Sequence, residues 1–152
     1  MKGDRVSDTL QLDNFTVKNF EFGIATSSNS FATFGIGPKA REGPNHDNLP
    51  YALAKAGYIK SAAYSLWLND RHASNGSILF GGVDTAKYKG ELETLPIVSE
   101  SGSYTGLQVA LSGLNISDGK GSSQDLGLAE PAAAALDCSS QYAFLPVISF
   151  KV

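Results

Sequence analysis

The sequence predicts an all-β protein, mainly strands with one or two short helices. Apolar and β-branched residues alternate with polar ones along several segments, as in strands that bury one face. Charged residues make up only 18% of the 152 residues, and 16 are glycine, which suits short strands and tight turns. With 42% hydrophobic residues, the chain has enough apolar material for the core of one ordinary domain.

The first two expected strands form a hairpin. Residues 6–12 alternate polar and apolar side chains, and Asp13-Asn14 is a turn signal. Residues 15–25 are rich in aromatic and β-branched side chains and read as the second strand. This strand is followed by a polar loop, a short apolar run at residues 31–37 and another polar loop.

One helix is expected directly after this second loop. Asn48, or a residue just before it, can cap the helix, and Pro50 fits the first turn, where a missing N–H is harmless. Residues 51–55 favour helix, and Gly57 is a natural stop.

The rest of the chain reads as strands and loops. Residues 64–68 and 77–80 form a hairpin with a long loop, and Asp84 caps a short turn. Residues 118–127 are rich in Gly and Ser and read as a loop. Further strands are expected at residues 90–97, 107–116, 132–136 and 145–150.

Several classes of function are disfavoured. The net charge is -3 and no block of Lys or Arg stands out, so a nucleic-acid-binding surface is not expected. No apolar run is long enough for a membrane helix, and the first residues lack the apolar region of a signal peptide. Cys138 is the single cysteine, and His46 and His72 lie in separate polar loops. We therefore expect no internal disulfide and no metal site.

Other short motifs carry little weight. Asp84-Thr85-Ala86 reads as a turn cap. Residues 35–40 match a dinucleotide-binding G-x-G-x-x-A pattern, but Pro38 removes an N–H needed for the phosphates. Asn-x-Ser/Thr sequons occur at Asn14, Asn75 and Asn115, and a couple are expected by chance in a chain rich in Ser and Thr.

Several longer stretches resemble segments of a known protein family. Residues 48–53, 57–59 and 63–70 resemble the first-lobe helix and following strand of pepsin-like aspartic peptidases, closest to the secreted, yapsin-like fungal branch. Residues 76–97 resemble the interdomain segment of that family almost residue for residue. Gly35-Ile36-Gly37 is similar to the glycine-rich segment near the first catalytic Asp.

The resemblance implies a partial, bilobal pepsin-like fold over residues 1–152. Residues 1–75 would end the N-terminal lobe, 76–100 would be interdomain strands, and 101–152 would begin a truncated C-terminal lobe. It also implies an aspartic-type endopeptidase acting on peptide or protein substrates. Such an enzyme would need no cofactor, would have an acidic optimum and would work outside the cell or at its surface.

The catalytic motifs of that family are missing or degenerate. Asp-Thr/Ser-Gly occurs nowhere in the chain, and the first motif and flap tyrosine would lie upstream of Met1. Asp137 stands where the second Asp would follow an apolar strand, but Cys138-Ser139-Ser140 replaces the rest of the motif. Alternatively, residues 137–150 resemble a later part of the second lobe, where the cysteine pairs with another. We prefer this alignment because it explains the ending at residues 145–150.

One substrate-binding residue is implied by the resemblance. Ala32-Thr33-Phe34 replaces the usual Gly-Ile-Leu, and Thr33 falls at a position that lines the cleft in relatives. The favoured hypothesis is an aspartic peptidase chain that is inactive in this form. The alternatives are a non-catalytic pseudopeptidase that binds peptides, and a two-fold pair that supplies Asp137 twice.

Overall fold

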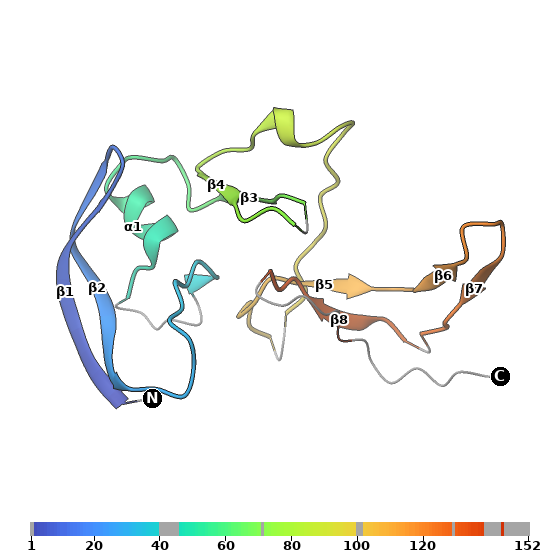
Figure 1. Ribbon diagram of the computed structural model, residues 1–152, viewed down its shortest axis with the longest axis horizontal. Helices are drawn as coiled ribbons and strands as arrows, with labels where there is room; N and C mark the ends of the chain where they lie inside the picture. Colours follow the sequence, from blue (N-terminus) through green and yellow to red (C-terminus); the bar gives the residue numbers. More distant parts are fainter. Residues whose placement is uncertain are drawn as a thin grey trace. The chain divides into compact units, whose positions relative to one another are not determined.

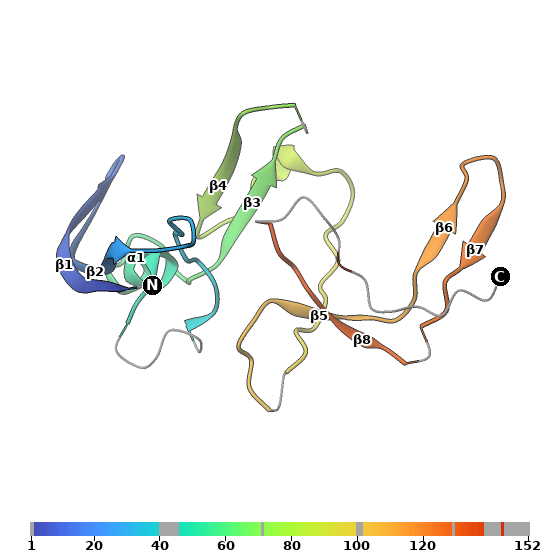
Figure 2. The ribbon, with the colours of Figure 1, turned by 60° about the horizontal axis from the view of Figure 1, so that its bottom comes forward.

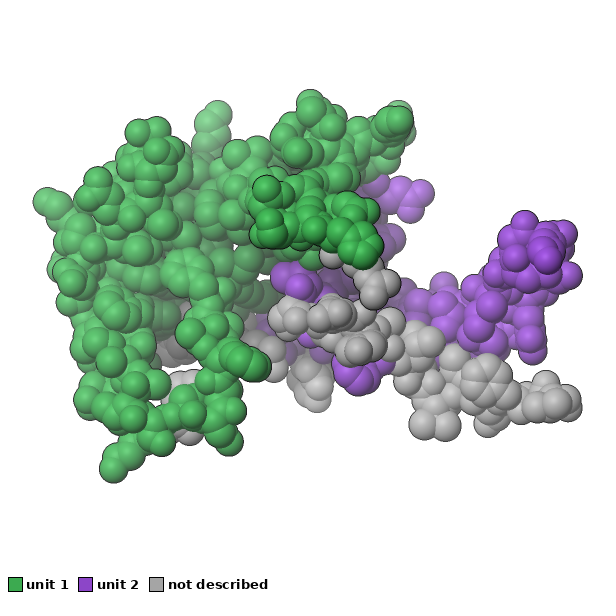
Figure 3. Space-filling view, in the orientation of Figure 1, with its two compact units in different colours: residues 1–92 green, residues 93–152 purple. Residues whose placement is uncertain are grey.

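A computed structural model describes residues 2–39, 46–70, 72–99, 102–128, 130–138 and 144. The chain divides into two units, Met1–Leu92 and Glu93–Val152, which Figure 3 colours separately. This division falls inside residues 76–100, the stretch predicted to be interdomain. The predicted lobe boundaries themselves stay a prediction.

The described residues are mostly strands with one α-helix, as the sequence predicted (Figure 1). The first unit contains β1 (Lys2–Leu12), β2 (Phe15–Ser27), α1 (Leu49–Lys55), β3 (Tyr64–Leu68), β4 (Gly76–Phe80) and the 3₁₀ helix η2 (Thr85–Lys87). The second contains β5 (Gln108–Leu111), β6 (Asn115–Ser117), β7 (Ser123–Asp125) and β8 (Ala132–Ala135).

The first hairpin contains a bulge that aims two side chains into the core. β1 and β2 run antiparallel, but Asp8 pairs with Phe20 whereas Leu10 pairs with Val17. The extra residue is taken up near Asn19, whose φ of 56° lies in the left-handed region. Val17 and Phe20 are three residues apart and would point to opposite faces of a regular strand. The bulge allows both to be buried.

The helix ends as its sequence predicts. Gly57 has a φ of 80°, its N–H donates to the carbonyl of Ala54 at 3.1 Å, and the N–H of Tyr58 donates to Leu53 at 3.0 Å. This pair of bonds is the Schellman motif that glycine favours. At the other end Asn48 is the N-cap residue, but its side chain makes no capping bond. Its Nδ2 donates instead to the carbonyl of Gly37 at 2.8 Å.

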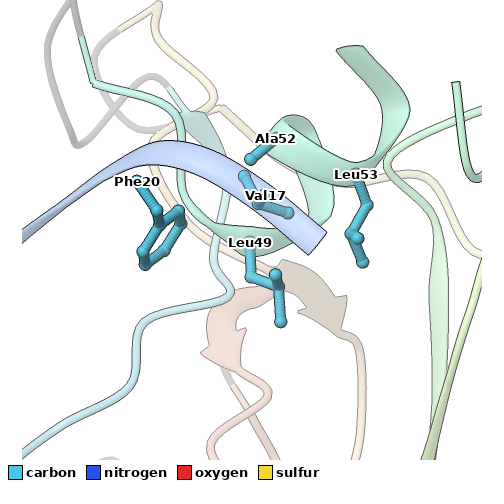
Figure 4. Packing of buried hydrophobic residues seen from close by; sticks show 5 residues of the cluster. All are labelled: Val17, Phe20, Leu49, Ala52 and Leu53. Carbon is cyan, nitrogen blue, oxygen red and sulfur yellow. The ribbon is translucent and has the colours of Figure 1, made fainter. Parts of the chain in front are cut away.

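The core of the first unit lies between β2 and α1. Figure 4 shows its buried side chains facing one another: Val17, Phe20, Leu49, Ala52 and Leu53. Leu10, Phe15, Ile59 and Phe80 pack against them and are partly buried. Because this core is small, each of its members carries a large share of the stability of the unit.

The second hairpin matches its prediction. Tyr64 pairs with Phe80 and Leu68 pairs with Gly76, with the long loop between them. Asp84 then caps η2, because its carboxylate accepts the N–H of Ala86 at 3.0 Å. The turn-cap interpretation of Asp84-Thr85-Ala86 is therefore confirmed.

Strand predictions in the second unit were only partly correct. β8 confirms the strand expected at residues 132–136, and it pairs with β5. The strand expected at residues 90–97 is wrong: it is reduced to a bridge between Ile97 and Val109, and Pro96 removes one ladder donor. The strand expected at 107–116 is split into β5 and β6, and residues 118–127 contain β7, which pairs with β6. Residues 145–150 lie outside the described part.

Candidate functional site

Asp137 lies two residues after the end of β8. β8 is short and made of alanines, and the N–H of Leu136 donates to the carbonyl of Leu107 at 2.8 Å, which extends the pairing with β5. Asp137 and Cys138 then emerge from the sheet and are exposed. Ser139 and Ser140 lie outside the described residues.

Thr33 lies in an exposed aromatic stretch after β2. Its hydroxyl donates to the carbonyl of Phe31 at 3.4 Å. Phe31 is 94% exposed and Phe34 is 58% exposed, although the Phe34 ring approaches that of Phe20 at 6.3 Å between centroids. The structure describes Thr33 within the first unit and Asp137 within the second. A role for either residue in binding or catalysis stays a prediction.

An ion cluster joins the start of α1 to the glycine-rich segment. Asp47 bonds Lys39 Nζ at 2.5 Å and Lys55 Nζ at 3.0 Å. The Lys39 bond, and then the Lys55 bond, hold the pKa of the Asp47 carboxyl below its usual value. Asp47 therefore stays ionised and paired in mild acid, so it is suited to structure and not to proton transfer.

His46, which the sequence places in a polar loop, is only partly exposed. Its side chain is 22% exposed, and its Nδ1 lies 3.7 Å from Glu21 Oε2. His72 is exposed, and its backbone N–H donates to Asp70 Oδ1 at 2.9 Å. Within the described ranges no three His, Cys, Asp or Glu side chains gather as a metal site would require.

A pocket that the sequence did not predict lies between β2 and α1. Its volume is about 720 Å³, and it is lined by residues 16–21 together with Asp47, Ala52, Lys55, Ala56 and Tyr58. The charges in the lining balance, and the Asp47 carboxylate is already bonded by two lysines. This pocket offers no activated nucleophile. Asn19, at the bulge of β2, is one of its lining residues.

The comparisons with known proteins decide the family. The family model for eukaryotic aspartyl proteases matches residues 1–146. The chain belongs to the eukaryotic aspartyl protease family. The predicted resemblance to pepsin-like peptidases is therefore confirmed.

Individual fungal relatives agree with this family. The chain is 45% identical over 95% of its length to "Probable aspartic-type endopeptidase OPSB" of Arthroderma benhamiae, of which it covers 31%. It is 43% identical over 76% of its length to "Secreted aspartic protease 8" of Candida albicans, covering 28% of that protein. It is also 37% identical over 92% of its length to "Aspartic proteinase 3" of Saccharomyces cerevisiae, again covering 28%. The chain therefore spans less than a third of the length of these aspartyl proteases.

Across the described residues, none of the helices combines the length and the apolar character that crossing a bilayer requires.

Proposed function

We propose that this chain is a non-catalytic portion of an aspartic-type endopeptidase and does not cleave peptide bonds by itself. The observation that carries this proposal is that Asp-Thr/Ser-Gly occurs nowhere in the 152 residues. The reaction requires two carboxylates that share one proton, so that one acts as a base on water and the other as an acid. Glycine lets the backbone turn tightly beneath each carboxylate. At Asp137 the motif reads Asp-Cys-Ser, so Ser139 stands where the glycine is required.

Exposed apolar side chains on the second hairpin support this proposal. Leu66, Trp67 and Leu68 of β3 are 40–61% exposed, and Ile78 and Leu79 of β4 are 38% and 44% exposed. Both strands of this two-stranded sheet also leave an outer edge unpaired within the described residues. Soluble proteins usually cover such surfaces and edges. They suit a chain that packs against further polypeptide of a peptidase.

A second candidate function is peptide binding without cleavage. The exposed stretch that contains Phe31, Thr33 and Phe34 favours it, because aromatic side chains beside a hydroxyl can hold an extended peptide. Under this alternative the chain would act as a pseudopeptidase module.

We also propose that the protein works outside the cell or at its surface. Support comes from the name of one relative, "Secreted aspartic protease 8". The substrates of the peptidase to which it belongs would be peptides or proteins.

The proposal is tested by separate cleavage and binding measurements on the purified chain. Wild type, Asp137→Asn, Thr33→Val and the control Asp84→Asn are incubated with a quenched-fluorescence peptide library from pH 3 to 7. We expect no cleavage by any of them. Saturable binding that Thr33→Val weakens would favour the pseudopeptidase. Cleavage that is lost in Asp137→Asn but kept in Asp84→Asn would overturn the proposal and favour the two-fold pair.

A further inference from the structure

The turn between β1 and β2 carries the sequon Asn14-Phe15-Thr16. Asn14 shares this two-residue turn with Asp13, and the ladder closes at the pair Leu12 and Phe15. Figure 2 shows the turn at the free end of the β1–β2 hairpin. Asn14 is exposed, and its Nδ2 donates to the carboxylate of the adjacent Asp13 at 3.2 Å. The amide is therefore reachable in the folded chain.

The sequon is also oriented with its apolar member inward. Phe15 is half-buried and its ring meets that of Tyr58 edge to face, with centroids 5.1 Å apart. Asn14 and Thr16, on either side of it, are both exposed. The Tyr58 hydroxyl holds the backbone of Thr16 by two hydrogen bonds and leaves the Thr16 side chain on the outer face. A large group on Asn14 would thus displace nothing from the core.

The asparagines of the other two sequons are also exposed, but each is tied to a residue that is not its neighbour in the sequence. The carboxamide of Asn75 points back across its loop, because its Oδ1 accepts from Asn69 Nδ2 at 2.7 Å. Asn69 Oδ1 in turn accepts from Trp67 Nε1 at 2.5 Å, so the Asn75 side chain is part of a chain of bonds along the hairpin. Asn115 lies within the short strand β6 and pairs with Asp125. Asn14 differs from both because it lies in a turn and its side chain bonds the adjacent Asp13.

We propose that Asn14 is a site of N-linked glycosylation. The inference rests on the extracellular location proposed above, because the oligosaccharide is transferred only inside the secretory pathway. In the transfer, Asn14 Nδ2 loses one proton and bonds to C1 of an oligosaccharide carried on a lipid diphosphate. The bond from C1 to the diphosphate oxygen breaks, and the lipid diphosphate leaves with the electron pair. The modified amide keeps one N–H, so the bond to Asp13 can persist.

A glycan at this turn would also cover exposed apolar surface. Leu12, which ends β1 beside the turn, is 39% exposed. A polar, bulky group next to it would hinder association of hairpins through their tips.

The experiment supplies the secretory environment so that only the site is tested. The whole chain, behind a cleavable secretion leader, is translated in vitro with microsomes, and protection from added protease shows that it has been translocated. Its electrophoretic mobility is compared with and without an endoglycosidase that removes N-glycans. We expect one discrete mass step that the endoglycosidase removes. Asn14→Gln and Thr16→Val should lose the step, while Thr16→Ser, Asn75→Gln and Asn115→Gln keep it.

Two outcomes would overturn the proposal. One is a protected chain with no mass step, and the other is a step that persists in Asn14→Gln and is lost in Asn75→Gln or Asn115→Gln. Asn14→Gln and Thr16→Val alter different residues of the sequon, so loss of the step in both is not explained by the misfolding of one variant. The readout does not involve peptide cleavage or binding, so its failure is distinct from failure of the proposed peptidase role.

Discussion

The hydroxyl of Tyr58 bonds both backbone groups of Thr16. It accepts the Thr16 N–H at 3.3 Å and donates to the Thr16 carbonyl at 3.2 Å. Tyr58 directly follows the glycine that ends α1, so one side chain ties the helix end to the start of β2. This contact joins residues 42 positions apart in the sequence.

Removing that hydroxyl should loosen the first unit. Tyr58→Phe keeps the ring that packs on Phe15 but removes both hydrogen bonds, and we expect a loss of about 1 kcal/mol in the free energy of unfolding. Urea unfolding followed by circular dichroism measures the change. Tyr104→Phe is the control, because Tyr104 is 62% exposed. Equal stability of Tyr58→Phe and wild type would show that the bonds contribute nothing.

The core between β2 and α1 should be intolerant of truncation. Leu53 is 0% exposed, so Leu53→Ala removes buried contacts and leaves a cavity. The expected loss is about 2–5 kcal/mol, enough to abolish cooperative melting of so small a core. Leu92→Ala, at a residue that is 57% exposed, should melt like wild type. Cooperative melting of Leu53→Ala at the wild-type temperature would contradict the described core.

Gly57, at the end of α1, should be sensitive to substitution because of its backbone conformation. Gly57→Ala places a Cβ at a φ of 80°, and we expect a loss of about 1 kcal/mol. Gly23→Ala is a matched control in β2, because a Cβ there meets nothing within 4 Å. Thermal melting of the two variants should differ, with Gly23→Ala close to wild type. The reverse order would rule out the Schellman ending.

Acid should weaken the cluster around Asp47. Its pKa is lowered, chiefly by the hydrogen bond from Lys39, so the folded state favours the ionised carboxyl. This stability is present above the ordinary carboxyl pKa of about 4 and is lost as the pH falls through the lower folded value. Melting temperatures measured from pH 6 to 2 should fall less steeply in Asp47→Asn than in wild type. The melting temperature of Asp47→Asn should still fall with falling pH, because Asp118 also has a lowered pKa. The main cause is the hydrogen bond that its carboxylate accepts from the backbone N–H of Lys120.

Local signals predicted the elements that depend on neighbouring residues. The turn at Asp13, the stop at Gly57 and the cap at Asp84 each follow from backbone chemistry within a few residues. The bulge at Asn19 was missed because it serves packing against α1, which lies far along the chain. Residues 90–97 were misread as a strand because a strand needs a partner, and only Ile97 bridges to one. Thr33 and Asp137 were named from the resemblance, and their roles stay predictions.

The most direct test of the central claim is mass spectrometry of a denatured protein substrate after incubation with the purified chain at pH 3 to 5. A fungal aspartic peptidase of the same family is the positive control. If the chain is a non-catalytic portion of such an enzyme, the substrate remains intact while the control digests it. New peptides that appear with wild type and disappear with Asp137→Asn would contradict the claim.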